Sequence, residues 1–172
     1  MLHAGTAILV KIVLAVWIDS VLIAPKRRRP AGPAVAKTLP SRGAGPSALR
    51  DLTILIVDDI EDTRSLYQHY FEFQGARVMT AADGEAALRL AAAERPDVIV
   101  LDLAMPRMTG WDVLRSLKSD ARTHIIPVVV VSGQTARQSA LEAGADRYCE
   151  KPCLPPDLLT EVLRARRGTR DQ

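Results

Sequence analysis

Three stretches of the chain are almost continuously apolar and rich in β-branched residues: 53–57 (TILIV), 97–103 (DVIVLDL) and 125–132 (IIPVVVVS). Strands buried on both faces of a parallel sheet show this pattern, because helices then cover each side of the sheet. Shorter strand candidates lie at residues 76–81 and 146–150. The pattern therefore predicts five strands.

Helical patterns fill the intervals between these strands. The first places Leu66, Tyr70 and Phe73 on one face and stops at Gly75, while the second opens at Asp83, a candidate N-terminal cap. The five predicted helical segments are residues 61–75, 83–96, 110–120, 134–145 and 155–167. Strands that alternate with helices predict an α/β fold, here a doubly wound five-stranded parallel sheet with five helices.

The first part of the chain has a different pattern. Residues 7–24 form an apolar stretch interrupted by Lys11, Asp19 and Ser20, and its length is near the lower limit for a bilayer span. The basic cluster that follows would stay on the cytoplasmic side of a membrane. Charges inside the stretch disfavour insertion. Residues 1–24 are therefore either a membrane anchor or an extension without function.

Residues 25–50 are rich in Pro, Gly, Ala and Arg and show no hydrophobic periodicity. Such a composition buries too little surface to offset the entropy of ordering, so it predicts a flexible linker. Residues 1–50 thus form a non-globular N-terminal arm. The folded domain is predicted at residues 51–167, followed by a short tail at 168–172.

The charge of the chain is divided between these parts. Residues 1–50 hold eight Lys or Arg and one acid, a net charge of +7, whereas residues 51–172 carry a net −4. The overall charge of +3 is therefore no sign that the folded domain binds nucleic acid, and we expect no such binding. Two cysteines, Cys149 and Cys153, without a metal-binding CxxC pattern, predict reduced thiols in a cytoplasmic protein.

Polar side chains lie at the ends of the predicted strands. Asp58 and Asp59 follow the first strand, Asp102 lies in the third, Ser132 ends the fourth and Lys151 follows the fifth. Parallel strands share a direction, so these residues meet in the crevice at one edge of the sheet. Three carboxylates there require a cation, and carboxylate and carbonyl oxygens suit Mg²⁺. A carboxylate beside Mg²⁺ and a lysine can also attack phosphorus to give an aspartyl phosphate.

Each of these residues alone has a simpler explanation. An Asp at a strand end is usually a turn former or a helix cap, a Lys before Pro is usually solvated, and a terminal Ser usually caps the next helix. Their occurrence together on successive strand ends of one domain favours a common site.

Five segments of the chain form a specific combination: ILIVDD (54–59), DVIVLDLAMPRMTGWDVL (97–114), PVVVVSG (127–133), AGAD (143–146) and YCEKP (148–152). Together they resemble the response-regulator receiver domain of two-component signalling. The resemblance extends over residues 51–167 and implies a flavodoxin-like fold.

The resemblance implies a role for each residue of the site. Asp102 is the expected phospho-acceptor, and Asp58, Asp59 and the backbone carbonyl of Ala104 are the expected Mg²⁺ ligands. Ser132 and Lys151 would bind the phosphoryl group, and Tyr148 would be the aromatic switch residue. The Lys151–Pro152 bond would be a cis peptide.

The resemblance also implies a function in phosphorelay signalling. A histidine kinase or phosphotransfer protein would donate a phosphoryl group to Asp102, and the resulting change of conformation would alter contacts with an unknown downstream protein. Self-dephosphorylation would reset the switch, and no enzymatic activity is expected beyond Mg²⁺-dependent self-phosphorylation and self-dephosphorylation. Since no effector sequence follows the last predicted helix, we expect a stand-alone receiver. It would be cytoplasmic, with residues 7–24 as a potential membrane tether.

Two other functions use the same features. An aspartyl-nucleophile phosphohydrolase combines Asp, Lys, Ser and Mg²⁺, but its usual signature places a second Asp two residues after the nucleophile, whereas Asp58 and Asp59 are adjacent. A phosphorylation-independent, membrane-tethered adaptor would depend mainly on residues 7–24. Turnover of a phosphate ester would favour the first, and membrane fractionation would test the second.

Overall fold

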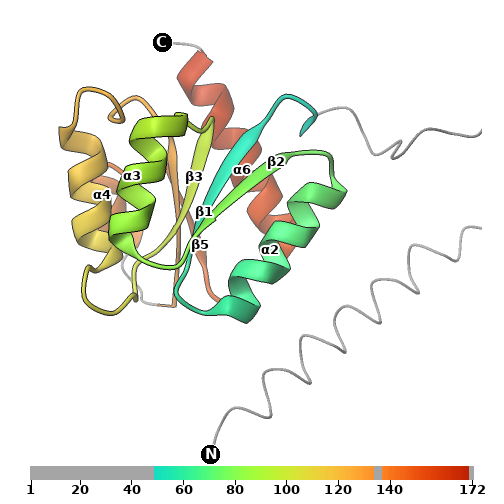
Figure 1. The fold of residues 1–172 in the computed structure, drawn as a ribbon, viewed down its shortest axis with the longest axis horizontal. Coiled ribbons are helices and arrows are strands. Elements are labelled where there is room, and N and C mark those ends of the chain that lie inside the picture. Colours follow the sequence, from blue (N-terminus) through green and yellow to red (C-terminus); the bar gives the residue numbers. More distant parts are fainter. Residues whose placement is uncertain (1–48, 134–136, 171–172) are drawn as a thin grey trace, which may run out of the picture. The chain divides into compact units, whose positions relative to one another are not determined.

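The computed structural model describes residues 49–133 and 137–170. The segment predicted at 1–24 lies outside the described residues. The same holds for residues 25–48 of the linker predicted at 25–50 and for residues 171–172 of the tail predicted at 168–172. Strands and helices alternate along the chain (Figure 1). The strands are β1 (Thr53–Val57), β2 (Arg77–Ala81), β3 (Val98–Asp102), β4 (Val128–Ser132) and β5 (Arg147–Glu150). The helices are α2 (Glu61–Phe73), α3 (Gly84–Glu94), α4 (Gly110–Ser119), α5 (Arg137–Glu142) and α6 (Pro155–Arg170).

The five strands form one parallel sheet in the order β2-β1-β3-β4-β5. The chain moves from β1 to one edge of the sheet and then crosses back to build the other side. This reversal between β1 and β3 separates the loops that follow these two strands, and a crevice forms at such a point in doubly wound sheets. The predicted fold class is confirmed.

Two apolar clusters occupy the two faces of the sheet. Helices α3 and α4 lie over one face, and α2 and α6 lie over the other (Figure 1). Successive residues of β1 alternate between the clusters, with Leu55 and Val57 in one and Ile54 and Ile56 in the other. Strands β3 and β4 are buried along their whole length. A strand covered on both faces has no polar side, which explains the continuous apolar runs in the sequence.

The packed face of α2 differs from the predicted one. Tyr67 and Phe71, four residues apart, are the buried residues of this helix, whereas Phe73 is 66% exposed. The prediction that Leu66, Tyr70 and Phe73 define its apolar face is therefore wrong for Phe73, whereas Tyr70 is partly buried and packs against the same cluster as Phe71. Helical spacing alone did not decide between two overlapping sets of apolar residues. The predicted end of the helix is confirmed, since Gly75 follows with a φ of +96°.

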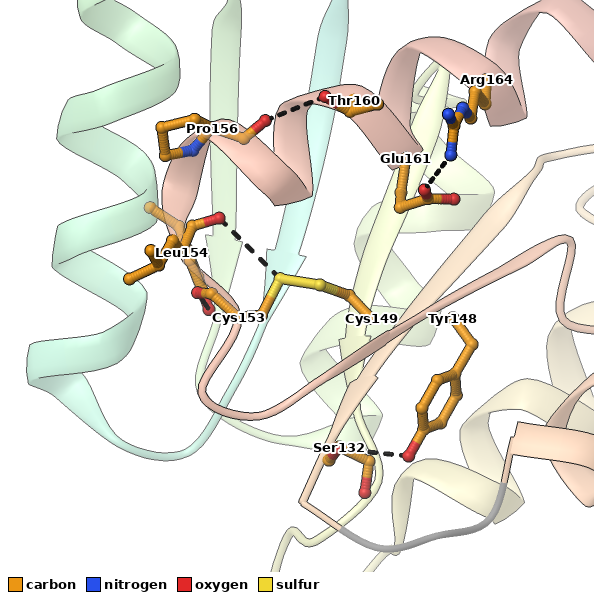
Figure 2. Close-up of a disulfide and its surroundings, with 10 residues drawn as sticks. Ser132, Tyr148, Cys149, Cys153, Leu154, Pro156, Thr160, Glu161 and Arg164 are labelled. Carbon is orange, nitrogen blue, oxygen red and sulfur yellow. Dashed lines mark hydrogen bonds and ion pairs between the residues drawn. A yellow bond between two sulfur atoms is a disulfide. The ribbon is translucent and has the colours of Figure 1, made fainter.

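The cysteines also correct a prediction. Cys149 and Cys153 form a disulfide, so the prediction that both thiols are reduced is wrong (Figure 2). The chain turns at Lys151 and Pro152 directly after β5, which brings the two Cα atoms to 5.9 Å, within the range that a disulfide requires. The Lys151–Pro152 bond is cis, as predicted. Among the residues that the structure describes, we find no helix with the length and apolar character of a membrane span.

Candidate functional site

Three carboxylates meet at the carboxyl edge of the sheet. Asp58 and Asp59 follow β1, and Asp102 ends β3, the neighbouring strand. One oxygen from each side chain lies within 4.8 Å of the others. Asp58 and Asp102 are both only 3% exposed. Such a concentration of buried negative charge is unfavourable unless cations compensate for it.

Lys151 supplies part of this compensation. Its Nζ lies 3.0 Å from Oδ2 of Asp102 and 3.3 Å from Oδ2 of Asp58. The backbone N–H of Lys151 donates to the carbonyl oxygen of Ser132 at 3.0 Å, which fixes the start of the lysine loop against the end of β4. The structure thus brings four of the predicted site residues into one cluster.

The Asp59 carboxylate has one oxygen that accepts no hydrogen bond. Its Oδ1 atom is buried and has no hydrogen-bond partner. A buried carboxylate oxygen without a donor is costly, and a metal ion beside it would remove that cost. The all-oxygen donor set and the adjacent carboxylates fit Mg²⁺ better than a softer metal. The residues present therefore fit a magnesium ion.

The pKa values of the cluster follow from its burial and its charges. Burial raises the pKa of Asp58 above its ordinary value, and the charge of Lys151 opposes this only in part. Burial lowers the pKa of Lys151, but its hydrogen bond to Asp102 and the charges of both carboxylates outweigh burial and raise it. Lys151 is therefore a permanent cation at neutral pH, whereas Asp58 would ionise more readily beside a second cation.

The backbone around the cluster orients the carboxylates. Asp58 accepts a hydrogen bond on Oδ1 from the N–H of Ile60 at 2.8 Å, and its carbonyl oxygen accepts one from Arg64 at 2.7 Å. The N–H of Ala104 donates to Oδ1 of Asp102 at 3.2 Å. The predicted role of the Ala104 carbonyl as a metal ligand stays a prediction. Sequence reasoning missed Arg64, although a basic residue one turn into the helix after an acidic pair is a usable signal.

Helix α4 packs directly against the end of β3. A Cβ atom on Gly110 would overlap the carbonyl oxygen of Asp102 and the Cα of Leu103. The preceding residue, Thr109, caps the helix in a reciprocal pair of hydrogen bonds with Asp112. Only glycine permits this approach, so Gly110 helps to set the position of Asp102.

Ser132 and Tyr148 lie together beside the cluster. Ser132 ends β4 and is fully buried, and the phenol of Tyr148 donates to its carbonyl oxygen at 3.2 Å (Figure 2). Tyr148 is 5% exposed, so its ring points inward in this structure. The predicted rotation of this ring on phosphorylation stays a prediction.

Tyr67 is a second residue that the sequence did not single out. Its phenol donates to the carbonyl oxygen of Cys153 at 2.8 Å and joins α2 to the loop that carries Lys151. Burial, together with the charges of Asp58 and Asp102, raises the pKa of Tyr67 to about 12. Its location four residues before Phe71 would have been a signal only if the packed face of α2 had been known.

Comparison with known proteins gives a consistent result. The family model described as "Response regulator receiver domain" matches residues 54–163. The chain is 43% identical over 102 residues to the response regulator PleD of Caulobacter vibrioides, across 58% of this chain and 22% of PleD. It is 40% identical over 121 residues to the transcriptional regulatory protein PrrA of Mycobacterium tuberculosis, across 67% of this chain and 51% of PrrA. The chain thus spans about half or less of the length of these curated relatives.

Solved structures agree on the fold. The chemotaxis protein CheY4 of Vibrio cholerae matches with a TM-score of 0.63 and 32% identity, over 66% of this chain and 98% of that one. The receiver domain of the Francisella response regulator 1452 matches with a TM-score of 0.65 and 28% identity, over 69% of this chain and 99% of that one.

Proposed function

The chain belongs to the family of response regulator receiver domains, and from that premise we propose that it accepts a phosphoryl group on Asp102. Receiver domains are in general signalling modules rather than enzymes. They bind Mg²⁺ at an acidic pocket and pair with histidine kinases or phosphotransfer proteins. The observation that carries the proposal is the buried Asp102 carboxylate, with the Lys151 ammonium at 3.0 Å.

The chemistry follows from the charges around Asp102. A carboxylate oxygen of Asp102 attacks the phosphorus of a donor phosphohistidine, the P–N bond breaks, and the imidazole leaves with its electron pair and takes up a proton. The ammonium group of Lys151 contacts Asp102 in this structure and would contact the phosphoryl oxygens after transfer. Bound Mg²⁺ would neutralise charge on the transferring group. Asp58, Asp59 and the backbone carbonyl of Ala104 would hold that ion.

The response to phosphorylation involves the neighbouring strand ends. The Ser132 hydroxyl would bond a phosphoryl oxygen, and Tyr148 would adjust because its phenol already contacts the Ser132 carbonyl. These contacts would bias a two-state equilibrium of the surface around α5 and β5 and so change binding to a downstream protein. Slow self-catalysed hydrolysis of the aspartyl phosphate would return the protein to its first state.

We assign the receiver domain to residues 51–167 and propose that it acts in the cytoplasm. The apolar segment at 7–24 lies outside the described residues, and its role as a tether rests on composition alone. Membrane fractionation of the full chain and of a chain without residues 1–50 tests that role. Recovery of the full chain in the soluble fraction alone would exclude a tether.

Phosphorylation by a small acyl phosphate, read by intact mass, tests the proposed function. The wild-type protein should gain one phosphoryl group with Mg²⁺ and much less after chelation. Asp102→Asn should gain none. Asp83→Asn is the matched control, because Asp83 follows β2 at the same edge of the sheet and Asn preserves its helix cap. Wild-type protein that stays unmodified would refute the function, and equal modification of Asp102→Asn would refute only the acceptor.

A further inference from the structure

The disulfide encloses the lysine of the site in a short covalent ring. Cys149 lies in β5, and its disulfide partner Cys153 lies four residues later (Figure 2). The ring therefore contains Glu150, Lys151 and Pro152. Any change in this bond therefore acts on the backbone that carries Lys151.

Both ends of the ring are held by the rest of the domain. Cys149 is paired with Val131 of β4. Cys153 is only 7% exposed, lies in the apolar cluster under α2 and α6, and accepts the hydrogen bond of Tyr67. The disulfide links these two anchors directly. The backbone of Lys151 consequently leaves the sheet along a fixed path.

This path determines where the lysine ammonium lies. The Nζ atom reaches Asp102 and Asp58 at 3.0 and 3.3 Å, at the far end of a flexible four-carbon side chain. If the ring opened, the residues inside it would regain conformational freedom. That freedom would be lost again each time Lys151 engages a transferring phosphoryl group.

The two cysteines differ in burial. Cys149 is half-buried, whereas Cys153 is buried, so we take Cys149 as the residue that an external thiolate attacks. The sulfur of Cys153 lies 3.9 Å from the carbonyl oxygen of Leu154 (Figure 2). A disulfide sulfur has no hydrogen to donate, but the thiol released by reduction would have an acceptor in place. The reduced form is thus also accommodated.

We propose that Cys149 and Cys153 form a thiol–disulfide exchange site that sets the rate of phosphorylation of Asp102; this inference rests on the proposed function. The co-reactant is a dithiol reductant. Its thiolate attacks the Cys149 sulfur, the S–S bond breaks, and Cys153 leaves as the free thiol. The second thiol of the reductant then releases Cys149. Two electrons and two protons pass to the protein, and the reductant becomes a disulfide.

The oxidised form is the faster acceptor, because its lysine loop is already ordered. Reversibility fits the cytoplasmic location proposed above, where protein disulfides are mostly transient, catalytic or redox-sensing. The site would therefore couple the thiol redox state of the cell to the signalling output.

The test compares two samples of the full chain, one kept oxidised and one treated with dithiothreitol that is then removed. Alkylation in denaturant, read by intact mass, should label neither cysteine in the first sample and both in the second. With acyl phosphate and Mg²⁺, reduction should slow phosphorylation about threefold to tenfold, or ~0.7–1.4 kcal/mol in the barrier. The Cys149→Ala/Cys153→Ala double variant should react at the slower rate with or without dithiothreitol. Circular dichroism checks that it is folded.

Three results would overturn the inference. Two alkylated cysteines before reduction would show that the disulfide does not form. Equal rates for fully oxidised and fully reduced wild-type protein would show that it does not control the reaction. A response of the double variant to dithiothreitol would place the effect elsewhere. Absence of phosphorylation in both redox states would instead refute the proposed function and, with it, the rate effect, whereas alkylation would still decide whether the exchange site exists.

Discussion

Asp59 differs from the other two carboxylates of the cluster because it has an oxygen with no partner. Asp58 and Asp102 both contact Lys151, whereas Oδ1 of Asp59 is buried and unpaired. Without Mg²⁺, Asp59→Asn removes one negative charge from a repulsive cluster, so the free energy of unfolding should stay the same or rise by about 1 kcal/mol. Saturating Mg²⁺ should raise the Tm of the wild-type protein and leave that of the variant nearly unchanged.

Thermal unfolding with Mg²⁺ and with a chelator measures both effects. At one hundred times its Kd, a ligand that binds only the folded state contributes ~2.7 kcal/mol, which is readily detected. Asp62→Asn is the matched control, since Asp62 is an exposed acid in the first turn of α2. It should retain the full Mg²⁺ shift. An undiminished shift in Asp59→Asn would contradict the assignment of Asp59 as a ligand.

Ionisation of Tyr67 should lower the free energy of unfolding of the domain at alkaline pH. Its pKa is about 12 in the folded protein and 10.0 without the environment of the site. Because the folded pKa is the higher, the contribution is fully present below pH 10 and is lost as the pH rises toward 12. At about pH 11 the loss should be about 1 kcal/mol relative to about pH 9.

Denaturant unfolding of the wild-type protein and of Tyr67→Phe at these two pH values isolates this contribution. The variant should be less stable at the lower pH by about 0.5–1.5 kcal/mol, because it lacks the hydrogen bond to Cys153. Its further decline at the higher pH should be smaller than that of the wild-type protein. An equal decline in both proteins would mean that Tyr67 does not titrate differently on unfolding.

The residues of the site were predictable to different degrees. Asp58, Asp102 and Lys151 could be placed together because each follows or ends a predicted strand. Parallel strands share a direction, so their carboxyl ends lie at the same edge of the sheet. Tyr67 could not, because its contact with Cys153 depends on how α2 is rotated about its axis. That rotation depends on packing against the sheet and not on the local sequence.

At the scale of elements, the contact between α4 and the end of β3 controls the position of Asp102. The substitution Gly110→Ala would drive a methyl group into the Asp102 carbonyl and the Leu103 backbone. We expect a loss of about 1–3 kcal/mol in the free energy of unfolding, together with slower phosphorylation of Asp102. Denaturant unfolding and the acyl phosphate assay measure the two effects.

Gly168→Ala is the matched control for this prediction. Gly168 lies in α6, and a Cβ there would have no neighbour within 4 Å. Alanine is the better helix former, so this substitution should be neutral or stabilise by up to about 1 kcal/mol. If both substitutions had the same effect, close packing of α4 on β3 would not be the cause.

The local hydrophobic pattern was sufficient to predict the bounds of the strands but not the contacts between elements. Strand β1 was predicted with the bounds that it has, and β2 to β5 were predicted with slightly long ends. Phe73 was wrongly placed on the packed face of α2, because Phe73 and Phe71 both fit the same apolar pattern. The disulfide was also missed, since the approach of Cys149 and Cys153 is created by the turn after β5. These failures share a cause: each depends on contacts that form only when the elements assemble.

At the scale of the whole domain, one sheet separates two apolar clusters and supplies residues to both. Loss of either cluster would expose one complete face of β1, β3 and β4, whose side chains are buried. Neither half can therefore stay folded without the other. The same arrangement places the three carboxylates of the site at the ends of β1 and β3, two adjacent strands that are covered on both faces.

Because the two clusters fold together, a substitution that destabilises one cluster should shift the unfolding transition seen by a probe in the other. Phe71 is fully buried in the cluster under α2 and α6, whereas Trp111 packs against the opposite cluster. Phe71→Ala should cost about 3–5 kcal/mol. In a Trp17→Phe background, where Trp111 is the only tryptophan, its fluorescence and the far-ultraviolet circular dichroism should shift to the same lower denaturant midpoint. Phe73→Ala, at a 66% exposed position of the same helix, should change the midpoint little. A Trp111 transition that stays at its original midpoint while the dichroism moves would show that the two faces of the sheet unfold independently.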